Sequence, residues 1–162
     1  MRKMKELFDA LEKWDLQVDF FIDTCFLFYI FDKHLEKEFV AFCKTHIVAL
    51  SSFTIEEALF HRHDVSHVFR ERFRHIVKDD LRLYRVSVPV HPGERDIEKL
   101  FISDFDKNLL QIVPDPSDAV LLVSAIEHNA NILTRDKHHL FTTKLENYLA
   151  DKGLKVYNSF PK

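Results

Sequence analysis

Four carboxylates stand where apolar segments of this chain end or where the next helical pattern begins. Asp23 follows the apolar residues 20–22 in the string FFIDT, and Asp136 follows another apolar segment in NILTRD. Asp118 opens a helical pattern in VPDPSDAVLLVSAIEH, and Glu57 lies in LSSFTIEEALF after a further apolar segment. Parallel strands present their carboxyl ends at one edge of a sheet, where open α/β folds build their sites. We therefore expect the four acids to meet at that edge.

Acids gathered in this way repel one another unless they share a cation or a proton. Two carboxylates roughly 4 Å apart repel by several kcal/mol at an effective dielectric constant near 20. Oxygen donors without a cysteine or histidine companion suit hard divalent cations. The pattern predicts a site for Mg²⁺ or Mn²⁺, ions that retain waters and take a phosphate oxygen as a ligand.

Each acid also has a purely structural explanation. Asp23 and Asp118 suit the first turns of helices, where the helix dipole favours a carboxylate. Asp115 is a fifth acid at the rim of the site or, as we favour, the cap of the helix that holds Asp118. Glu57 has capping-box spacing with a threonine three residues earlier, and Glu56 beside it is the alternative ligand. Four independent coincidences, all at strand ends, are the less economical explanation.

Strand and helix patterns alternate along the chain. The predicted strands span residues 18–23, 47–51, 85–90, 131–134 and 155–157, and the predicted helices span 26–44, 55–77 (with a break allowed), 93–110, 118–128 and 138–151. Near-continuous apolar strands are typical of a parallel sheet covered by helices on both faces. The fold class predicted is α/β, a three-layer α/β/α sandwich with a central parallel sheet of about five strands.

The chain shows no linker or repeat, so residues 1–162 are predicted to form a single domain. Residues 1–17 are predicted to be an additional N-terminal amphipathic helix, because the apolar side chains recur at helical spacing. The members of that stripe are Met4, Leu7, Phe8, Leu11 and Trp14. This helix either packs on its own domain or contacts a second copy or a partner.

Composition excludes several other classes of protein. Gly93 and Gly153 are the only glycines, and neither lies in an acid-bearing strand-to-helix turn, which excludes a glycine-rich cradle for a nucleotide cofactor. No apolar run approaches the roughly 20 residues of a membrane helix, and the first residues lack the apolar segment that a signal peptide requires, so neither feature is expected. Cys25 and Cys43 are typical of reduced thiols, so the prediction is a cytoplasmic protein without a membrane partner. The net charge of −3 means that any surface for nucleic acid must be local.

The motifs resemble those of the PIN-domain nucleases, which include the VapC-type toxins of toxin–antitoxin pairs. The matching segments are FIDT, SSFTIEE and SDAVLLVSAIEHNANILTRD, and the resemblance covers about residues 18–157. It implies a Rossmann-like fold and a metal-dependent endoribonuclease that cleaves RNA, commonly as a homodimer and, in a toxin, with an antitoxin partner. It implies that four acids are the catalytic metal ligands and that hydroxyls support them: Asp23, Glu57, Asp118 and Asp136, with Thr24, Ser52 and Thr134.

Two features depart from the pattern of small toxins in this family. A helix precedes the first strand, and residues 61–85 hold seven Lys or Arg, four His and four acids. This basic region is either a solvated amphipathic helix or a face that contacts the RNA backbone. The candidate RNA contacts are Arg62, Arg70, Arg74 and Arg82. The histidine pairs 61/63 and 138/139 lack the spacing of a zinc site and are predicted to be surface residues.

Two other functions stay open. The first is a PIN-like module that binds RNA or protein without catalysis, although retention of all four mutually repelling acids argues against it. The second is a phosphatase or receiver-like domain, for which FIDT lacks a second aspartate two residues further on.

Overall fold

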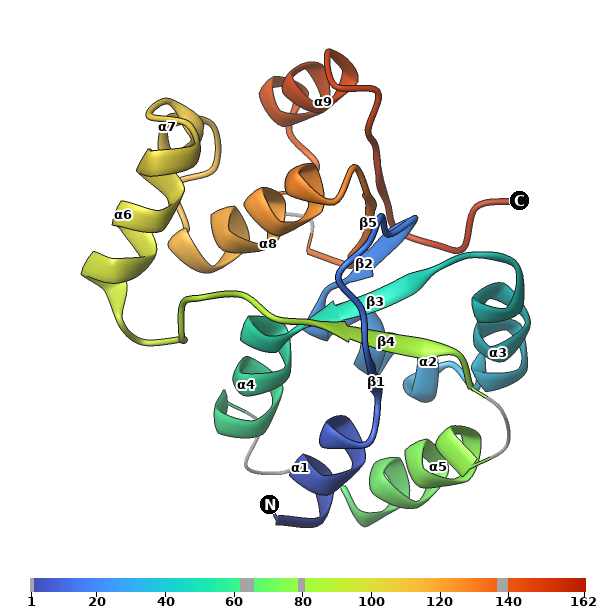
Figure 1. Cartoon of the computed structure of the whole chain (residues 1–162). Helices are drawn as coiled ribbons and strands as arrows, with labels where there is room; N and C mark the ends of the chain where they lie inside the picture. Colours follow the sequence, from blue (N-terminus) through green and yellow to red (C-terminus); the bar gives the residue numbers. More distant parts are fainter. Residues whose placement is uncertain (1, 62–65, 79–80, 137–139) are drawn as a thin grey trace.

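The computed structural model has one parallel sheet between two layers of helices (Figure 1). It describes residues 2–61, 66–78, 81–136 and 140–162. Within these ranges six strands run in the order β1-β4-β3-β2-β5-β6, and each neighbouring pair is parallel. They are β1 (Glu12–Lys13), β2 (Phe20–Ile22), β3 (Val48–Ser51), β4 (Leu83–Val86), β5 (Asn131–Leu133) and β6 (Val156–Tyr157). The predicted α/β fold class is confirmed, with six strands in place of about five.

Helices cover both faces of the sheet, and each face has its own apolar core. Phenylalanine rings dominate the core beneath α1, α2, α3 and α5, whereas aliphatic side chains of α8 dominate the core beneath α6 to α9. The helices are α1 (Arg2–Asp9), α2 (Thr24–Asp32), α3 (Glu36–Thr45), α4 (Ser52–His61), α5 (His67–Lys78), α6 (Arg95–Phe105), α7 (Leu109–Ile112), α8 (Pro116–Glu127) and α9 (Thr143–Ala150). In the part of the chain described, none of them is both long and apolar enough to cross a membrane.

Two of the long predicted helices are each two shorter helices. The predicted helix over residues 26–44 divides into α2 and α3, and His34 between them takes a left-handed backbone conformation with φ of 55°. A residue with this φ cannot be part of a right-handed helix. The helical spacing of apolar residues therefore continues from α2 into α3 although a turn separates the two helices. The pattern over residues 93–110 likewise divides into α6 and α7.

The predicted helix over residues 1–17 is wrong beyond Asp9. The chain turns there and pairs as β1 with β4, the strand that holds Tyr84. Leu11 joins the core under α1, but Trp14 lies in the core of the opposite face, where its ring contacts Tyr84 with centroids 4.5 Å apart. A spacing that resembles one helical stripe therefore arises from two segments on opposite faces of the sheet.

The order of the strands determines where a site can form. The chain passes from β2 to β3 and β4 on one side and returns to β5 on the other side of β2. The boundary between β2 and β5 is thus the topological switch point, where open α/β sheets bind ligands at the carboxyl ends of the strands. Ile22 is in register with Leu133, so the loops after both strands leave the sheet side by side.

Candidate metal-binding site

Asp23 lies at the switch point, and three donors hold its carboxylate. It is the N-cap of α2, with Oδ1 accepting a hydrogen bond from the Thr24 N–H at 2.8 Å. Its Oδ2 accepts from the Thr134 hydroxyl at 2.8 Å and from the Cys25 thiol at 3.3 Å. The capping explanation of Asp23 is therefore correct, but capping uses one oxygen, and the other points to the loop after β5.

Thr134 connects the loops that follow β2 and β5. Its hydroxyl is fully buried, donates to Asp23 and accepts from the Asp136 N–H at 3.1 Å. Cys25 Sγ lies 3.3 Å from the same hydroxyl and accepts from the Arg135 N–H at 3.2 Å. This network fixes Asp23 relative to Asp136. Nothing in the sequence motifs had pointed to Cys25 as a member of it.

The other two predicted hydroxyl partners make different contacts. The Thr24 hydroxyl donates to the Thr54 carbonyl at 3.4 Å, so Thr24 supports Asp23 through its backbone N–H. The Ser52 hydroxyl accepts from the Val88 N–H at 2.8 Å and therefore engages the chain after β4.

Helix α4 begins three residues earlier than predicted. Ser51 Oγ accepts a hydrogen bond from the Thr54 N–H at 3.0 Å, which is the interaction of an N-cap. Thr54 therefore lies inside the helix and forms no capping box with Glu57, which belongs to the second turn. A capping box therefore does not explain Glu57.

Glu56 and Glu57 face different surroundings. Glu56 contacts the exposed His91 at 2.9 Å, and this hydrogen bond raises the pKa of His91. Burial raises the pKa of Glu57 to about 7, and the neighbouring charge of Asp23 adds to the shift. Glu57 is therefore the glutamate that lies near the other acids.

Asp118 lies in the first turn of α8, after the N-cap Asp115, whose Oδ1 accepts from the Ser117 N–H at 2.9 Å. Burial raises the pKa of Asp118 to about 8, and the charges of Asp23, Asp136 and Asp115 raise it further. A side-chain hydrogen bond with Asp136 acts in the same direction. Near pH 7 and without a cation, Asp118 therefore holds a proton next to Asp136.

Asp23 therefore lies within electrostatic reach of each of the other three predicted acids, and Asp118 lies within reach of Asp136. Burial also raises the pKa of Asp23, the hydrogen bonds that it accepts oppose this, and the charge of Asp136 raises it again. As the side chains stand, no three carboxylate, imidazole or thiol groups among the described residues are arranged to hold a metal ion. The donor chemistry nevertheless fits a hard divalent cation, because oxygens predominate and the protons held here would be released on binding.

Two further charged residues extend this group, and no motif had indicated them. Glu98 of α6 is fully buried, and Arg95 Nη1 lies 3.8 Å from its Oε1. The same nitrogen lies 3.8 Å from Asp115 Oδ1. One signal was available: Glu98 lies one helical turn before the buried Ile102, on the apolar face of an amphipathic helix, where a charge is out of place.

Two of the predicted RNA contacts, Arg70 and Arg74, lie on α5, which is beside α1 (Figure 1). Arg70 is partly buried, and its Nε has no hydrogen-bond partner in the described part of the chain. Arg74 pairs with Glu71 at 3.3 Å, and Arg82 is exposed. Arg62 lies outside the described residues, as do His63, His138 and His139. The contact of the four arginines with RNA stays a prediction.

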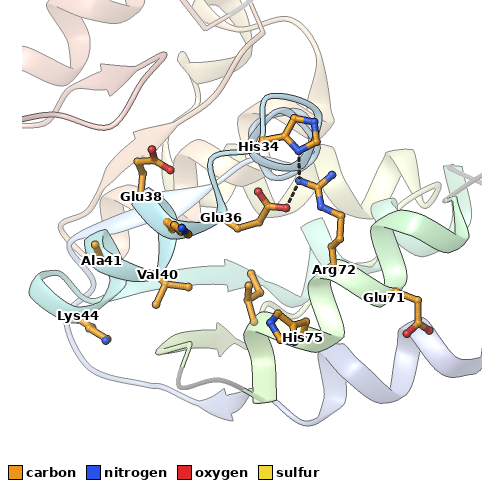
Figure 2. Close-up of a pocket in the computed structure, with 11 residues that line it drawn as sticks. His34, Glu36, Glu38, Val40, Ala41, Lys44, Glu71, Arg72 and His75 are labelled. Atoms are coloured by element: carbon orange, nitrogen blue, oxygen red, sulfur yellow. Dashed lines mark hydrogen bonds and ion pairs between the residues drawn. The ribbon is translucent and has the colours of Figure 1, made fainter.

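A groove of about 860 Å³ lies between α3 and α5. Figure 2 shows Arg72 of α5 directed at His34 and at Glu36 of α3. Val40 and Ile76 are apolar members of its lining, and none of the four acids is among the residues that line it. The groove is therefore separate from the candidate site.

A family model described as PIN domain matches residues 20–143, a range that holds all four acids. Because the match covers most of the chain, this protein belongs to the PIN domain family. Members of this family are generally nucleases, and they generally use divalent metal ions such as Mg²⁺ or Mn²⁺. The match is to the domain as a whole and does not single out the VapC-type toxins. No curated protein and no solved structure matches the chain.

Proposed function

We propose that this protein is a divalent-metal-dependent endoribonuclease whose metal ligands are Asp23, Glu57, Asp118 and Asp136. The observation that carries the proposal is the raised pKa of Asp118, to about 8, in the company of two other acids of the set. Crowded carboxylates destabilise a fold unless they have a cation or a proton to share. A cluster of this kind at the switch point of a PIN fold supports a cation-binding role.

The residues of the chain have distinct parts in this proposal. Thr134 and Cys25 hold the Asp23 carboxylate, and Thr134 also fixes the backbone of Asp136. Asp118 gives up its proton when the cation binds, so all four acids can then act as charged ligands. A bound Mg²⁺ or Mn²⁺ supplies neutralisation of charge on the phosphate oxygens and a lowered pKa of a coordinated water.

Cleavage of RNA tests the proposal directly. Purified protein with Mn²⁺ or Mg²⁺ should cut single-stranded RNA, and excess EDTA should stop the reaction. Asp23→Asn and Asp136→Asn should each lose most activity while remaining folded. The exposed Asp32 of α2 provides a matched control, because Asp32→Asn removes an acid that lies outside the cluster. Cleavage that persists in EDTA or in the two site variants would contradict metal-dependent catalysis by these acids.

The arginines of the basic region are proposed as contacts to the RNA backbone. Arg82 is exposed, which supports such a role, although Arg74 already pairs with Glu71. Replacing Arg70 and Arg74 together with alanine should weaken RNA binding and reduce its salt slope by roughly one unit per lost phosphate contact. If the dependence of RNA affinity on salt concentration is unchanged, the basic region is better explained as a solvated helix.

A second candidate function is a PIN-like module that binds RNA or protein without catalysis. The observation that favours it is that no three donors in the described residues are arranged to hold an ion. Wild-type protein that binds RNA in a shift assay, without cleavage at any Mn²⁺ concentration, would support this alternative over the nuclease.

The toxin role, an antitoxin partner and a homodimer also remain proposals. Ile97 and Leu100 of α6 are 50% and 62% exposed, which supports contact with a second chain on that helix. Leu100→Lys should then lower the mass measured by light scattering from dimer to monomer. For the toxin role, expression of the wild-type protein should arrest growth, whereas expression of Asp23→Asn should not.

A further inference from the structure

Arg135 is a cation in the loop after β5, and it stands between Thr134 and Asp136 in the sequence. Its backbone N–H donates to Cys25 Sγ at 3.2 Å, and the same thiol donates to the Asp23 carboxylate. The side chain of Arg135 therefore starts from a fixed point beside the acids at the switch point. Its guanidinium forms no ion pair within the residues that the structure describes, because it contacts an aromatic ring and a backbone carbonyl instead.

These two contacts hold the guanidinium in one place. Its Cζ lies over the Tyr29 ring, 4.2 Å from the ring centroid. Its Nη1 donates to the Asn158 carbonyl at 2.8 Å. A guanidinium is planar and carries its N–H donors around its edge, so a ring against its face and a carbonyl on one nitrogen leave most of these donors available.

Both partners of the guanidinium are themselves anchored in the core. Tyr29 belongs to α2, the helix that Asp23 caps, and its ring packs on Phe26 with centroids 5.6 Å apart. Asn158 follows β6, and Phe160 beyond it packs on the same Phe26 ring at 5.3 Å. The guanidinium is therefore preorganised, and it loses little conformational freedom when it binds a ligand.

The acids at the switch point give a reason for a fixed cation beside them. Each phosphate of an RNA backbone is negatively charged, so carboxylates repel the substrate whose phosphodiester bond they are proposed to cleave. Arg135 is partly exposed, and arginine binds a phosphate through two parallel N–H donors. Its position next to Asp136 in the chain brings such a donor to the acids without neutralising them.

We infer that Arg135 binds a phosphate group of the RNA backbone beside the acids, with Tyr29 and Asn158 holding its guanidinium for that contact. The inference rests on the proposed function, because it takes RNA as the ligand of the site. It assigns the role to a residue outside the basic region of residues 61–85, and it concerns the binding of RNA rather than its cleavage.

RNA binding without cleavage tests the inference. In an Asp118→Asn background with EDTA, fluorescence anisotropy measures the affinity for a fluorescein-labelled oligouridylate over a series of KCl concentrations. Arg135→Gln removes the charge, whereas its amide can still donate to the Asn158 carbonyl. This variant should bind about tenfold more weakly, as expected for a lost hydrogen bond to a charged group. Its salt slope should fall by about 0.7, the value for one phosphate of a single strand.

The matched control is a second arginine that donates to a backbone carbonyl. Arg85 Nε donates to the Leu11 carbonyl at 3.1 Å, and β3 and β2 lie between its strand, β4, and β5. Arg85→Gln should leave the affinity and the salt slope unchanged. An equal fall in both variants would overturn the inference, because the net charge of the protein would then matter and not the position of Arg135.

The outcomes separate this inference from its alternatives. If Arg135 only ties the C-terminal segment to the fold, Arg135→Gln binds RNA as the background protein does, and the inference is overturned. Weaker binding with an unchanged salt slope would indicate contact with a base, which also overturns it. A background protein that binds no RNA has the same consequence. If the wild-type protein fails to cleave RNA with Mn²⁺ while Arg135→Gln still lowers the salt slope, the proposed function fails alone.

Tyr29 gives an independent test of how the guanidinium is held. Tyr29→Phe keeps the ring and should bind RNA like the background protein. Tyr29→Leu removes the ring but leaves the charge of Arg135, so its affinity should fall about threefold, as for a partly exposed cation–π contact, with the salt slope kept. Equal affinity in the two variants would contradict the inference. This pair keeps the test decisive if Arg135→Gln lacks the circular dichroism spectrum of the wild-type fold.

Discussion

Two regions of this protein concentrate charge, and they treat it in opposite ways. In the groove between α3 and α5, Arg72 pairs with Glu36 and contacts His34, so opposite charges from facing helices neutralise one another (Figure 2). At the switch point, acids face other acids, and burial together with like charge raises the pKa of Asp118 to about 8. The groove is balanced without any ligand, whereas the switch point is balanced only with a proton or a cation.

This difference separates charges that stabilise the fold from charges that await a ligand. A neutralised pair contributes to the folded state and gives little reason for an ion to bind. An uncompensated cluster is unfavourable in the empty protein and becomes favourable when a cation arrives, because the ion binds the native state alone. The volume of a cavity does not make this distinction: the groove of about 860 Å³ is at the balanced region.

The largest expected effect is on catalysis at the switch point. Asp23→Asn should lower RNA cleavage at least about 100-fold, because charge stabilisation by a metal is worth several kcal/mol and each 1.4 kcal/mol is tenfold in rate. Its melting temperature in EDTA should not fall, since a buried charge is removed. Arg72→Ala should behave in the opposite way, with cleavage retained and stability lowered. Equal loss of cleavage in both variants would remove the distinction between the regions.

Thr134→Val should have the next largest effect. The buried hydroxyl donates to Asp23 and accepts from the Asp136 N–H, so its loss releases both acids. Partners of metal ligands typically contribute 10–100-fold to affinity or activity, and we expect a loss of about that size in Mn²⁺ affinity and cleavage. Thr134→Ser keeps the hydroxyl and should restore most of both. Equal losses in the serine and valine variants would show that the methyl group, and not the hydroxyl, matters.

The fold could be predicted from the sequence because its signals are local. Apolar strands and alternating helices depend on neighbouring residues, so the parallel sheet and its two helical layers were correctly anticipated. β1 could not be anticipated, because the pairing of two polar residues, Glu12 and Lys13, with β4 depends on a distant strand. The apolar spacing of Trp14 and Leu11 matched a helix for reasons that only the sheet reveals.

The residues of the site also divide into those with a local sequence signal and those that only the fold brings together. Acids at strand ends are visible in a sequence because the strand-to-helix junction is itself a local pattern, and Asp23 and Asp118 were found in this way. Cys25 lies two residues from Asp23, but its contact with Thr134 crosses from one strand loop to another. Glu98 comes from a helix that carries no motif, so its place near Asp115 and Glu57 follows only from the packing of α6 on α8.

The pH dependence of the metal-free protein gives a smaller effect with a definite sign. The folded-state pKa values of Asp118 and Glu57 are about 8 and about 7, above their usual 3.8 and 4.5. The folded protein therefore binds protons more tightly than the unfolded chain. Their contribution to stability is present below about pH 4 and is lost as the pH rises toward 8. In EDTA the melting temperature should fall between pH 5 and pH 8.

Asp118→Asn should flatten that profile, because it removes a carboxyl group whose pKa is raised to about 8. Each kcal/mol corresponds to about 2–4 °C in a domain of this size, so the fall should amount to several degrees in the wild type and clearly less in the variant. Saturating Mn²⁺ should reverse the slope, since deprotonated acids bind the ion better. A melting temperature that rises from pH 5 to pH 8 in EDTA would contradict the raised pKa values.

The smallest expected effect is in the groove, where Arg72→Ala should lower the free energy of unfolding by about 1 kcal/mol. The side chains of Arg72 and Glu36 are 27% and 18% exposed, so the pair is partly screened by water and should resemble a strong surface salt bridge. Arg72 also lies over the Phe31 ring, 5.6 Å from its centroid, so part of the loss comes from this contact. A double-mutant cycle with Glu36→Gln, measured by urea unfolding, isolates the ion pair from the aromatic contact. A coupling energy near zero would mean that Arg72 and Glu36 do not compensate each other's charge. The groove and the switch point would then differ only in the signs of the charges that they hold.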